Sequence, residues 1–279
     1  MIRLAVQSRL VPGDSLREKH ERALAFGFDG LELSGFPMID LAREAVRDSV
    51  PVTAMCSGHR GWFIDPDPNE IAACLEDVKV LLELSAQLGG APLIVVPIYG
   101  RTHNLPPHCG TGRSRDEDRD LWLEGLREVT EYADAVGGRL VVEAINRFEN
   151  SISVKVADAV GFAREMNSPN VRAMGDVFHM NIEEVDLGAA FESMEDMLAY
   201  VHLADSQRLE PGQGHLDWTN VFAGLVRSKY DGFASLECNL SGSADTVLPA
   251  SAEFLRQRIA EAQGANADAA RAADTAGDA

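Results

Sequence analysis

Four side chains that favour divalent cations lie at the ends of four successive apolar runs in the second half of the chain. They are Glu143, Asp176, His202 and Glu237. A charged group in an apolar run is costly to bury unless it is paired or binds a metal. Three carboxylates with one imidazole form an oxygen-rich set, which suits Mn²⁺, with Mg²⁺ or Co²⁺ as alternatives, better than a thiolate-rich structural zinc site. We therefore expect one divalent cation here.

Each of these residues also has a structural interpretation when it is taken alone. A buried His202 could simply be hydrogen-bonded, Glu143 or Glu237 could pair with an arginine such as Arg147, and Asp176 could cap the following helix. Taken together, the four residues favour a metal site. Such a site leaves two positions of an octahedral shell for a carbonyl and a neighbouring hydroxyl, so that the cation would make the adjacent C–H more acidic.

Strand-like apolar runs alternate with amphipathic stretches of helical period as far as residue 263, which is typical of repeated βα units. Eight strands are predicted, at residues 2–8, 30–34, 52–57, 93–99, 140–146, 171–176, 200–205 and 233–238. The helices predicted between and after them include residues 15–26, 69–88, 119–135, 156–165, 218–226 and 250–263. No G-x-G-x-x-G turn follows any strand, so a closed (β/α)₈ TIM barrel of the α/β class is favoured over an open doubly wound sheet. In such a barrel the carboxyl ends of the strands meet at the active site.

The composition narrows the class of protein further. The chain has 279 residues and a formal net charge of -19, which disfavours nucleic acid and anionic membranes as partners. Its four cysteines form no C-x-x-C pair, and no apolar run has the length of a membrane span, so we expect a reduced, soluble, cytoplasmic protein. One catalytic domain over residues 1–263 is predicted, followed by a disordered alanine-rich tail over residues 264–279. A homo-oligomer is compatible with the sequence.

The chain resembles the xylose isomerase-like TIM barrel superfamily of sugar phosphate isomerases and epimerases, and is most similar to the ketose 3-epimerases of the tagatose and psicose type. The resemblance covers nearly the whole chain. Its most specific segments are EAINRFEN from Glu143, DVFHMNIEE from Asp176, HLADSQR from His202 with the PGQGHLDW that follows, and LEC around Glu237. The resemblance implies that Glu143 and Glu237 are metal ligands that also act as an acid/base pair on opposite faces of the substrate.

The same resemblance implies that Asp176 and His202 complete the metal shell, and that Glu149, His179 and Arg208 hold substrate oxygens. It implies a divalent-metal-dependent isomerase or epimerase of a small sugar, a ketose or related polyol-ketone, working by proton transfer through a metal-bound enediolate. The first half of the chain would set specificity, through Glu32, Cys56, His59, Trp62 and the segment at residues 99–115. In that segment His103, His108 and Cys109 could suggest a second metal, but a lid is the preferred interpretation.

Other activities stay open within and beyond this class. Aldose-ketose isomerisation, hydroxypyruvate isomerisation and inosose dehydration also exploit acidity beside a carbonyl. A metal-dependent AP endonuclease shares the barrel, but its multinuclear site needs further histidines, and Arg208 stands where another ligand pair would be expected. A non-catalytic subunit of a sugar-modifying complex has no need of two opposed carboxylate bases. The sequence does not name the sugar.

Overall fold

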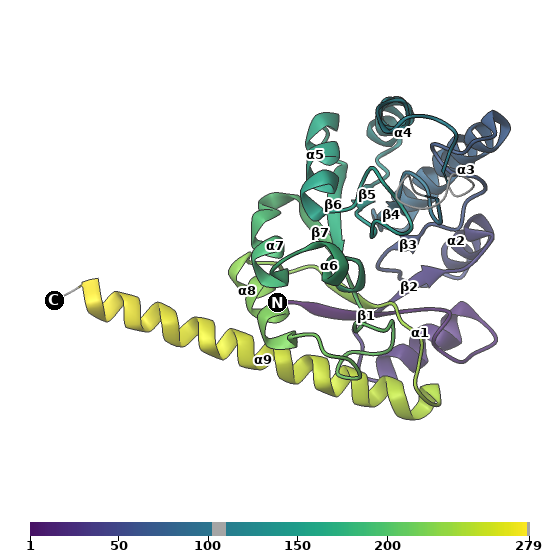
Figure 1. Cartoon of the computed structure of the whole chain (residues 1–279). Coiled ribbons are helices and arrows are strands. Elements are labelled where there is room, and N and C mark those ends of the chain that lie inside the picture. The colour runs from purple at the N-terminus through teal and green to yellow at the C-terminus, as the bar shows by residue number, and fades with distance from the viewer. Residues whose placement is uncertain (102–109, 278–279) are drawn as a thin grey trace.

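The computed structural model describes residues 1–101 and 110–277 (Figure 1). Eight parallel strands close into a barrel in sequence order, with β1 paired to β8, so the predicted (β/α)₈ barrel is confirmed. The strands are β1 Arg3–Gln7, β2 Gly30–Ser34, β3 Met55–Cys56, β4 Leu93–Val95, β5 Leu140–Glu143, β6 Val171–Asp176, β7 Leu198–Leu203 and β8 Phe233–Leu236.

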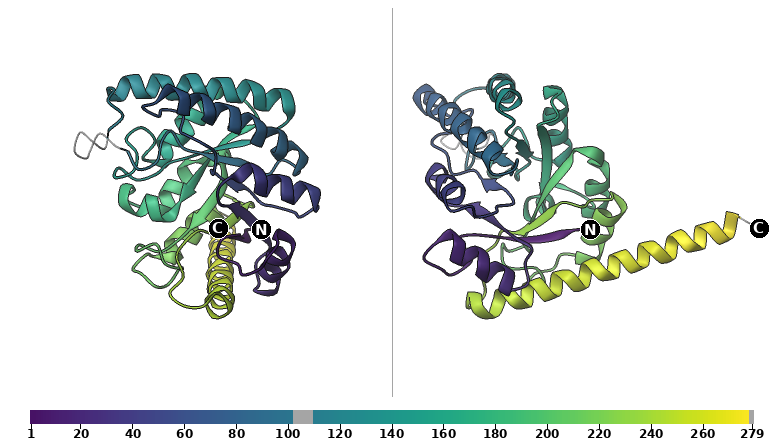
Figure 2. Two further views of the ribbon diagram at one scale, coloured as in Figure 1. Left: turned by 90° about the vertical axis from the view of Figure 1, so that its right-hand side faces the viewer. Right: turned by 180° about the vertical axis from the view of Figure 1, so that it is seen from behind.

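The helices pack around the outside of this barrel (Figure 2). They are α1 Leu16–Ala25, α2 Met38–Arg47, α3 Pro68–Gln87, α4 Arg115–Val136, α5 Val156–Met166, α6 Val177–Glu183, α7 Leu187–Ser193, α8 Trp218–Arg227 and α9 Ala244–Gly277, with a 3₁₀ turn at Glu195–Met197. The sixth unit thus carries two short helices. The observed β4 is shorter than the predicted strand, and Pro97 lies just beyond its end, where proline has no N–H to donate to a ladder.

Apolar side chains alternate between two cores. The larger core lies between sheet and helices and includes Leu93, Val95 and Val142, whereas the intervening Ile94 and Val141 belong to a small separate cluster with Tyr200. This alternation is the period of two expected of strands, and it shows that the smaller cluster fills the barrel interior. The barrel is therefore closed by side chains beneath the polar residues at its carboxyl end.

The last helix extends well beyond the barrel. Helix α9 begins at Ala244 and continues to Gly277, and its end projects away from the other elements in Figure 1 and in the right-hand view of Figure 2. Residues 264–269 are exposed. Residues 264–277, for which the sequence predicts disorder, are thus helical in the structure. The domain boundary at residue 263 stays a prediction.

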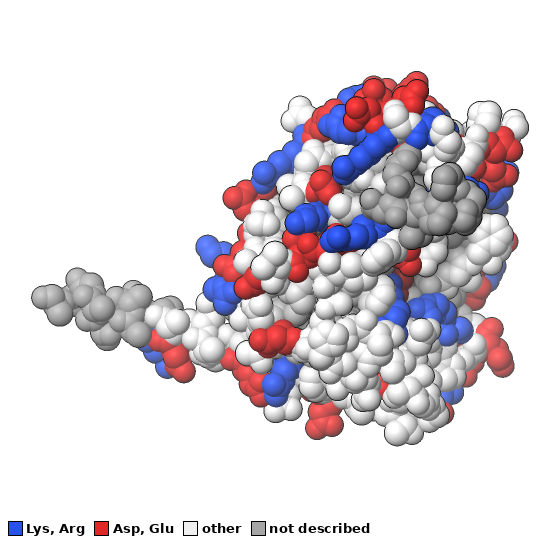
Figure 3. Space-filling view, in the orientation of Figure 1, with Lys and Arg blue, Asp and Glu red and all other residues white. Residues whose placement is uncertain are grey.

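Surface charge is mixed on the face shown in Figure 3, where acidic and basic side chains lie among each other. Within the described ranges, no helix combines the length and apolarity that crossing a membrane would require.

Candidate metal centre and active site

The four predicted metal ligands meet at the carboxyl end of the barrel. Glu143 and Asp176 are the last residues of β5 and β6, His202 lies one residue before the end of β7, and Glu237 directly follows β8. One ligand atom from each lies within 4.8 Å of the others. Asp176 also caps α6, because one carboxylate oxygen accepts from the backbone N–H of Phe178 while the other faces the cluster. The capping and metal interpretations of this residue are therefore compatible.

The imidazole of His202 has carboxylates next to both of its ring nitrogens. Its Nδ1 atom lies 2.9 Å from Glu237, 3.6 Å from Glu143 and 4.0 Å from Asp176. This buried nitrogen makes no well-aligned hydrogen bond despite the short distance to Glu237. An unpartnered nitrogen surrounded by three carboxylates has the donor atoms that a divalent cation needs, so the residues fit the implied metal.

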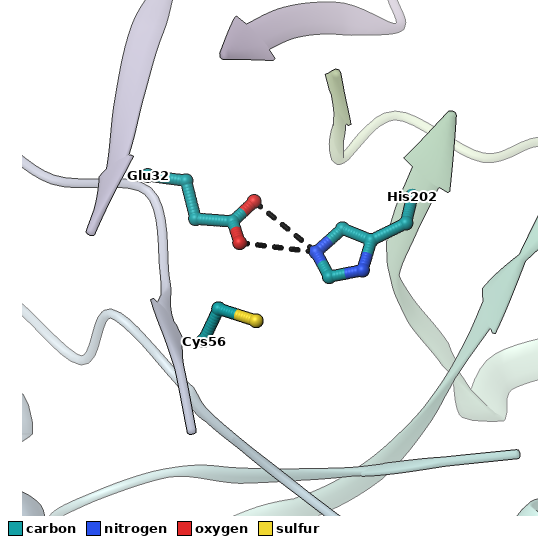
Figure 4. Close-up of side chains that lie close together, drawn as sticks. All are labelled: Glu32, Cys56 and His202. Carbon is teal, nitrogen blue, oxygen red and sulfur yellow. Dashed lines mark hydrogen bonds and ion pairs between the residues drawn. The ribbon is translucent and has the colours of Figure 1, made fainter. Parts of the chain in front are cut away.

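The other ring nitrogen of His202 contacts Glu32 from β2. Nε2 lies 3.1 and 3.2 Å from the two carboxylate oxygens of Glu32, and both side chains are fully buried (Figure 4). Cys56 lies beside them, so that Glu32, Cys56 and His202 form a second group of potential ligands. Burial, followed by the nearby Glu237 and Glu32 carboxylates, raises the pKa of the Cys56 thiol well above its usual value.

Arg208 joins two of the predicted ligands. Its guanidinium lies 2.6 Å from Asp176 and 2.5 Å from Glu237, and it stacks on the ring of Phe178. The β7–α8 loop that carries it is held by buried Asp205, which accepts from Trp218 Nε1 at 2.9 Å and from the N–H of Gly212 at 2.8 Å. Asp205 therefore positions the loop, and Arg208 brings a permanent positive charge to the centre.

The two proposed acid/base carboxylates have opposite electrostatics. Burial raises the pKa of Glu143, and the neighbouring Glu237 and Asp176 add to this against the opposing effect of His202. Burial also acts to raise the pKa of Glu237, but His202 and Arg208 outweigh it and hold this pKa well below its usual range. Two carboxyl groups whose pKa values are pushed apart are suited to separate acid and base roles.

The predicted substrate residues Glu149 and His179 lie next to one another. The backbone N–H of Asn146 donates to His179 Nδ1 at 3.2 Å, so the ring proton belongs on Nε2, which lies 3.6 Å from Asp176. Glu149 accepts from Asn146 Nδ2 at 2.9 Å and from the Tyr99 hydroxyl at 3.3 Å. The side chains of His179 and Glu149 are thus oriented by residues that the sequence did not single out.

A cavity of about 310 Å³ opens above this cluster. Its walls include Arg9, Cys56, Trp62, Tyr99, Ile145, His179, Arg208 and the two carboxylates Glu143 and Glu237. Of the predicted specificity residues, Cys56 and Trp62 line the cavity, whereas Glu32 lies behind His202 and does not. His59 is buried against Trp62 and Phe63. The proposed second-metal residues and the centre of the proposed lid, at 102–109, fall outside the described residues.

The sequence interpretation missed Gln7 and Arg9. Gln7 Nε2 donates to Glu32 at 3.0 Å and to Glu237 at 2.8 Å, and its carbonyl oxygen accepts from Arg9 Nε at 2.7 Å. A signal was present, because Gln7 is the last residue of the apolar strand β1 and Arg9 follows it, at the carboxyl end where the active site of a barrel lies.

This fold, with its cluster of potential metal ligands, is that of a barrel of the xylose isomerase type, and comparison with known proteins agrees. The model of the xylose isomerase-like TIM barrel family matches residues 21–258, and the chain belongs to this family. A 3-dehydro-D-guloside 4-epimerase of Escherichia coli K12 is 31% identical over 241 residues, covering 85% of this chain and 92% of that protein. A D-psicose 3-epimerase of Enterocloster bolteae is 36% identical over 228 residues, covering 78% and 74%.

A solved structure gives the same result for the fold. The 3-keto-D-glucoside 4-epimerase from E. coli superposes with a TM-score of 0.83 at 29% identity, over 92% of this chain and all of that one. The chain is accordingly an isomerase of the sugar epimerase type, similar to the ketose 3-epimerases and to these keto-glycoside epimerases.

Proposed function

We propose that this chain is a divalent-metal-dependent epimerase that inverts a carbon next to the carbonyl of a ketose or related keto-sugar. The observation that supports this most strongly is the convergence of Glu143, Asp176, His202 and Glu237, whose ligand atoms lie within 4.8 Å of one another at the carboxyl end of the barrel. A bound cation, with Mn²⁺ favoured, would polarise the carbonyl and acidify the neighbouring C–H.

The protein groups have separate tasks in this proposal. Glu237, the more acidic carboxyl, is ionised and removes the proton from one face of the carbon. Glu143, whose pKa is raised by burial, is the group that delivers a proton to the opposite face. In the reverse reaction the two exchange roles. Arg208 and the Nε2–H of His179 donate hydrogen bonds to substrate oxygens on which negative charge develops.

Two substrate classes suit this chemistry. The name of the guloside relative places the inverted carbon 4 next to a ketone at carbon 3, and that protein matches this chain over most of both lengths. Free ketoses are the class of the psicose relative. A panel assayed with Mn²⁺ should therefore contain 3-keto-glycosides and free ketoses, with aldoses, inososes and hydroxypyruvate as tests of the alternative reactions.

An endonuclease is disfavoured by the charges around the site. The two terminal nitrogens of the Arg208 guanidinium form ion pairs with the proposed ligands Asp176 and Glu237. The net charge of -19 would also repel the phosphate backbone of a nucleic acid. One metal ion per chain is expected, whereas two or three would favour the nuclease.

The mechanism is tested by the variant Glu237→Gln and by solvent deuterium. Glutamine keeps the size of the side chain and one oxygen for the metal but cannot act as a base, so turnover should fall by about 10²- to 10⁴-fold. In D₂O the unmodified enzyme should place deuterium on the inverted carbon, measured by NMR of the product. The exposed Glu253→Gln is the matched control and should leave turnover unchanged.

Two results would contradict this mechanism. One is full activity of the Glu237→Gln variant. The other is product that lacks solvent deuterium while retaining the hydrogen of a substrate labelled at that carbon, because hydrogen would then be transferred without exchange through the two carboxyl groups.

A further inference from the structure

We propose that Glu32 is a positioning residue for the cation site, which it serves by fixing the imidazole of His202 with its proton on Nε2. The lone pair of Nδ1 is then directed toward the three ligand carboxylates. This inference rests on the proposed function, because it presupposes a cation between His202 and those carboxylates. Glu32 lies outside the cavity and touches neither the proposed substrate position nor the proposed cation position.

The geometry around His202 supports this role. A carboxylate only accepts hydrogen bonds, and Glu32 places both oxygens within 3.2 Å of Nε2 (Figure 4). When the imidazole is neutral, as a metal ligand must be, its single proton is thus held on Nε2. Nδ1 is left as the free acceptor, buried and without a hydrogen bond, 2.9 Å from Glu237.

Glu32 is itself held in one orientation by neutral donors. Gln7 Nε2 donates to one oxygen at 3.0 Å, and the Tyr200 hydroxyl donates to the other at 3.1 Å. The same hydroxyl lies 2.7 Å from Thr53 Oγ1. Gln7 lies at the carboxyl end of β1 and Tyr200 in the interior of the barrel. Because both donors are held in place, the Glu32 carboxylate has little freedom to turn away from His202.

A purely structural carboxylate would have a different partner. A fully buried acid is ordinarily stabilised by an arginine or lysine, as Asp118 is by Arg113 at 2.6 Å. Glu32 contacts an amide, a phenol and one imidazole, and within the described ranges no lysine or arginine forms an ion pair with it. Among the residues that the structure describes, His202, the proposed metal ligand, is the only group in contact with Glu32 that can carry a positive charge.

The same contacts link Glu32 to the proposed base. The side-chain nitrogen of Gln7, Nε2, carries two N–H groups. One donates a hydrogen bond to Glu32, and the other donates to Glu237 at 2.8 Å. Because Arg9 Nε donates a hydrogen bond to the side-chain oxygen Oε1 of Gln7, the orientation of the Gln7 side-chain amide is fixed. Glu32 therefore sets the orientation of one cation ligand directly and of a second through Gln7.

The test compares Glu32→Gln with Tyr200→Phe in the full-length protein. Glutamine retains the shape of Glu32 but replaces one acceptor oxygen with a donor group and removes the charge. Tyr200→Phe removes a hydrogen bond from the same buried carboxylate but keeps the aromatic ring, which packs edge-on against His202. Mn²⁺ affinity is measured by titration, following the free Mn²⁺ signal by electron paramagnetic resonance. We expect the affinity of Glu32→Gln to fall about 10- to 100-fold, and that of Tyr200→Phe to fall less, because the Glu32 carboxylate and its contact with His202 remain in that variant.

A second measurement does not depend on the folding of a variant. In the unmodified protein loaded with diamagnetic Mg²⁺, ¹⁵N NMR of the His202 ring should show the proton on Nε2. A proton on Nδ1 would overturn the inference, as would equal Mn²⁺ affinities of the unmodified and Glu32→Gln proteins. Two Mn²⁺ ions per chain, one of them lost in Glu32→Gln, would make Glu32 a ligand and overturn it too. If the unmodified chain bound no Mn²⁺, the proposed function would fail together with the inference.

Discussion

Two groups of charged side chains at the carboxyl end of the barrel differ in the balance between carboxylates and positively charged groups. Arg147, after β5, pairs with Glu183 of α6 through contacts of 2.9 and 2.7 Å, one carboxylate to one guanidinium. Burial acts to raise the pKa of Glu183, but Arg147 outweighs it and the pKa is lowered. Arg147 thus serves a different carboxylate from the Glu143 or Glu237 considered from the sequence.

The second group, the acidic cluster, has more carboxylates than cations. Its members are Glu32, Glu143, Asp176, Glu237, His202 and Arg208. Four carboxylates there face one guanidinium and one imidazole. A buried excess of negative charge is unfavourable unless a cation joins it. We therefore expect the balanced pair to contribute to stability, and we place the proposed binding and chemistry in the unbalanced cluster.

The largest effect that tests this contrast is expected from Arg208→Ala. We expect kcat/KM to fall about 10- to 100-fold, because a hydrogen bond to a charged group contributes about 1.5–3 kcal/mol. Mn²⁺ affinity, measured by titration, should stay the same or increase, since the guanidinium occupies the same carboxylates as the cation would. Loss of the metal together with this side chain would show that Arg208 stabilises the ligand set and would weaken the contrast.

A smaller effect of a different kind is expected from Arg147→Ala. Glu183 keeps only 3% of its side chain exposed and would lose its counter-charge, while Arg147 is half exposed. We expect the free energy of unfolding to fall by about 1–2 kcal/mol, between the values for exposed and buried pairs, as measured by urea denaturation. Turnover per folded molecule and Mn²⁺ affinity should be unchanged. A fall in kcat without loss of stability would place this pair in the functional group.

The smallest effect is expected from removing residues 264–279. The segment from 264 to 269 is exposed and projects from the barrel, so the melting temperature should change by less than about 2 °C, corresponding to less than about 0.5 kcal/mol. A large decrease in melting temperature would mean that the end of α9 packs against another surface, and the domain boundary at residue 263 would then be wrong.

The barrel could be predicted because its signals are local. The alternation of strands and helices, and the polar residue that ends each of four late strands, can be read along the chain. The role of Glu32 could not be read in this way, because it depends on β2 and β7 facing each other across the barrel. The sequence placed Glu32 among the specificity residues, and only the closed sheet shows it behind His202. The specificity loops carry no periodic pattern, so their contacts depend on tertiary packing.

The pairing of β1 with β8 has a consequence for the order of events during synthesis. Gln7 leaves the ribosome before its partner Glu237, which follows β8, near the end of the barrel. Between the appearance of Glu143 and that of Glu237, roughly 5 to 20 seconds pass at ordinary translation rates of about 5–20 residues per second. During this interval the nascent chain has an open sheet edge and an incomplete ligand set. The proposed cation site is therefore completed only after the barrel has closed.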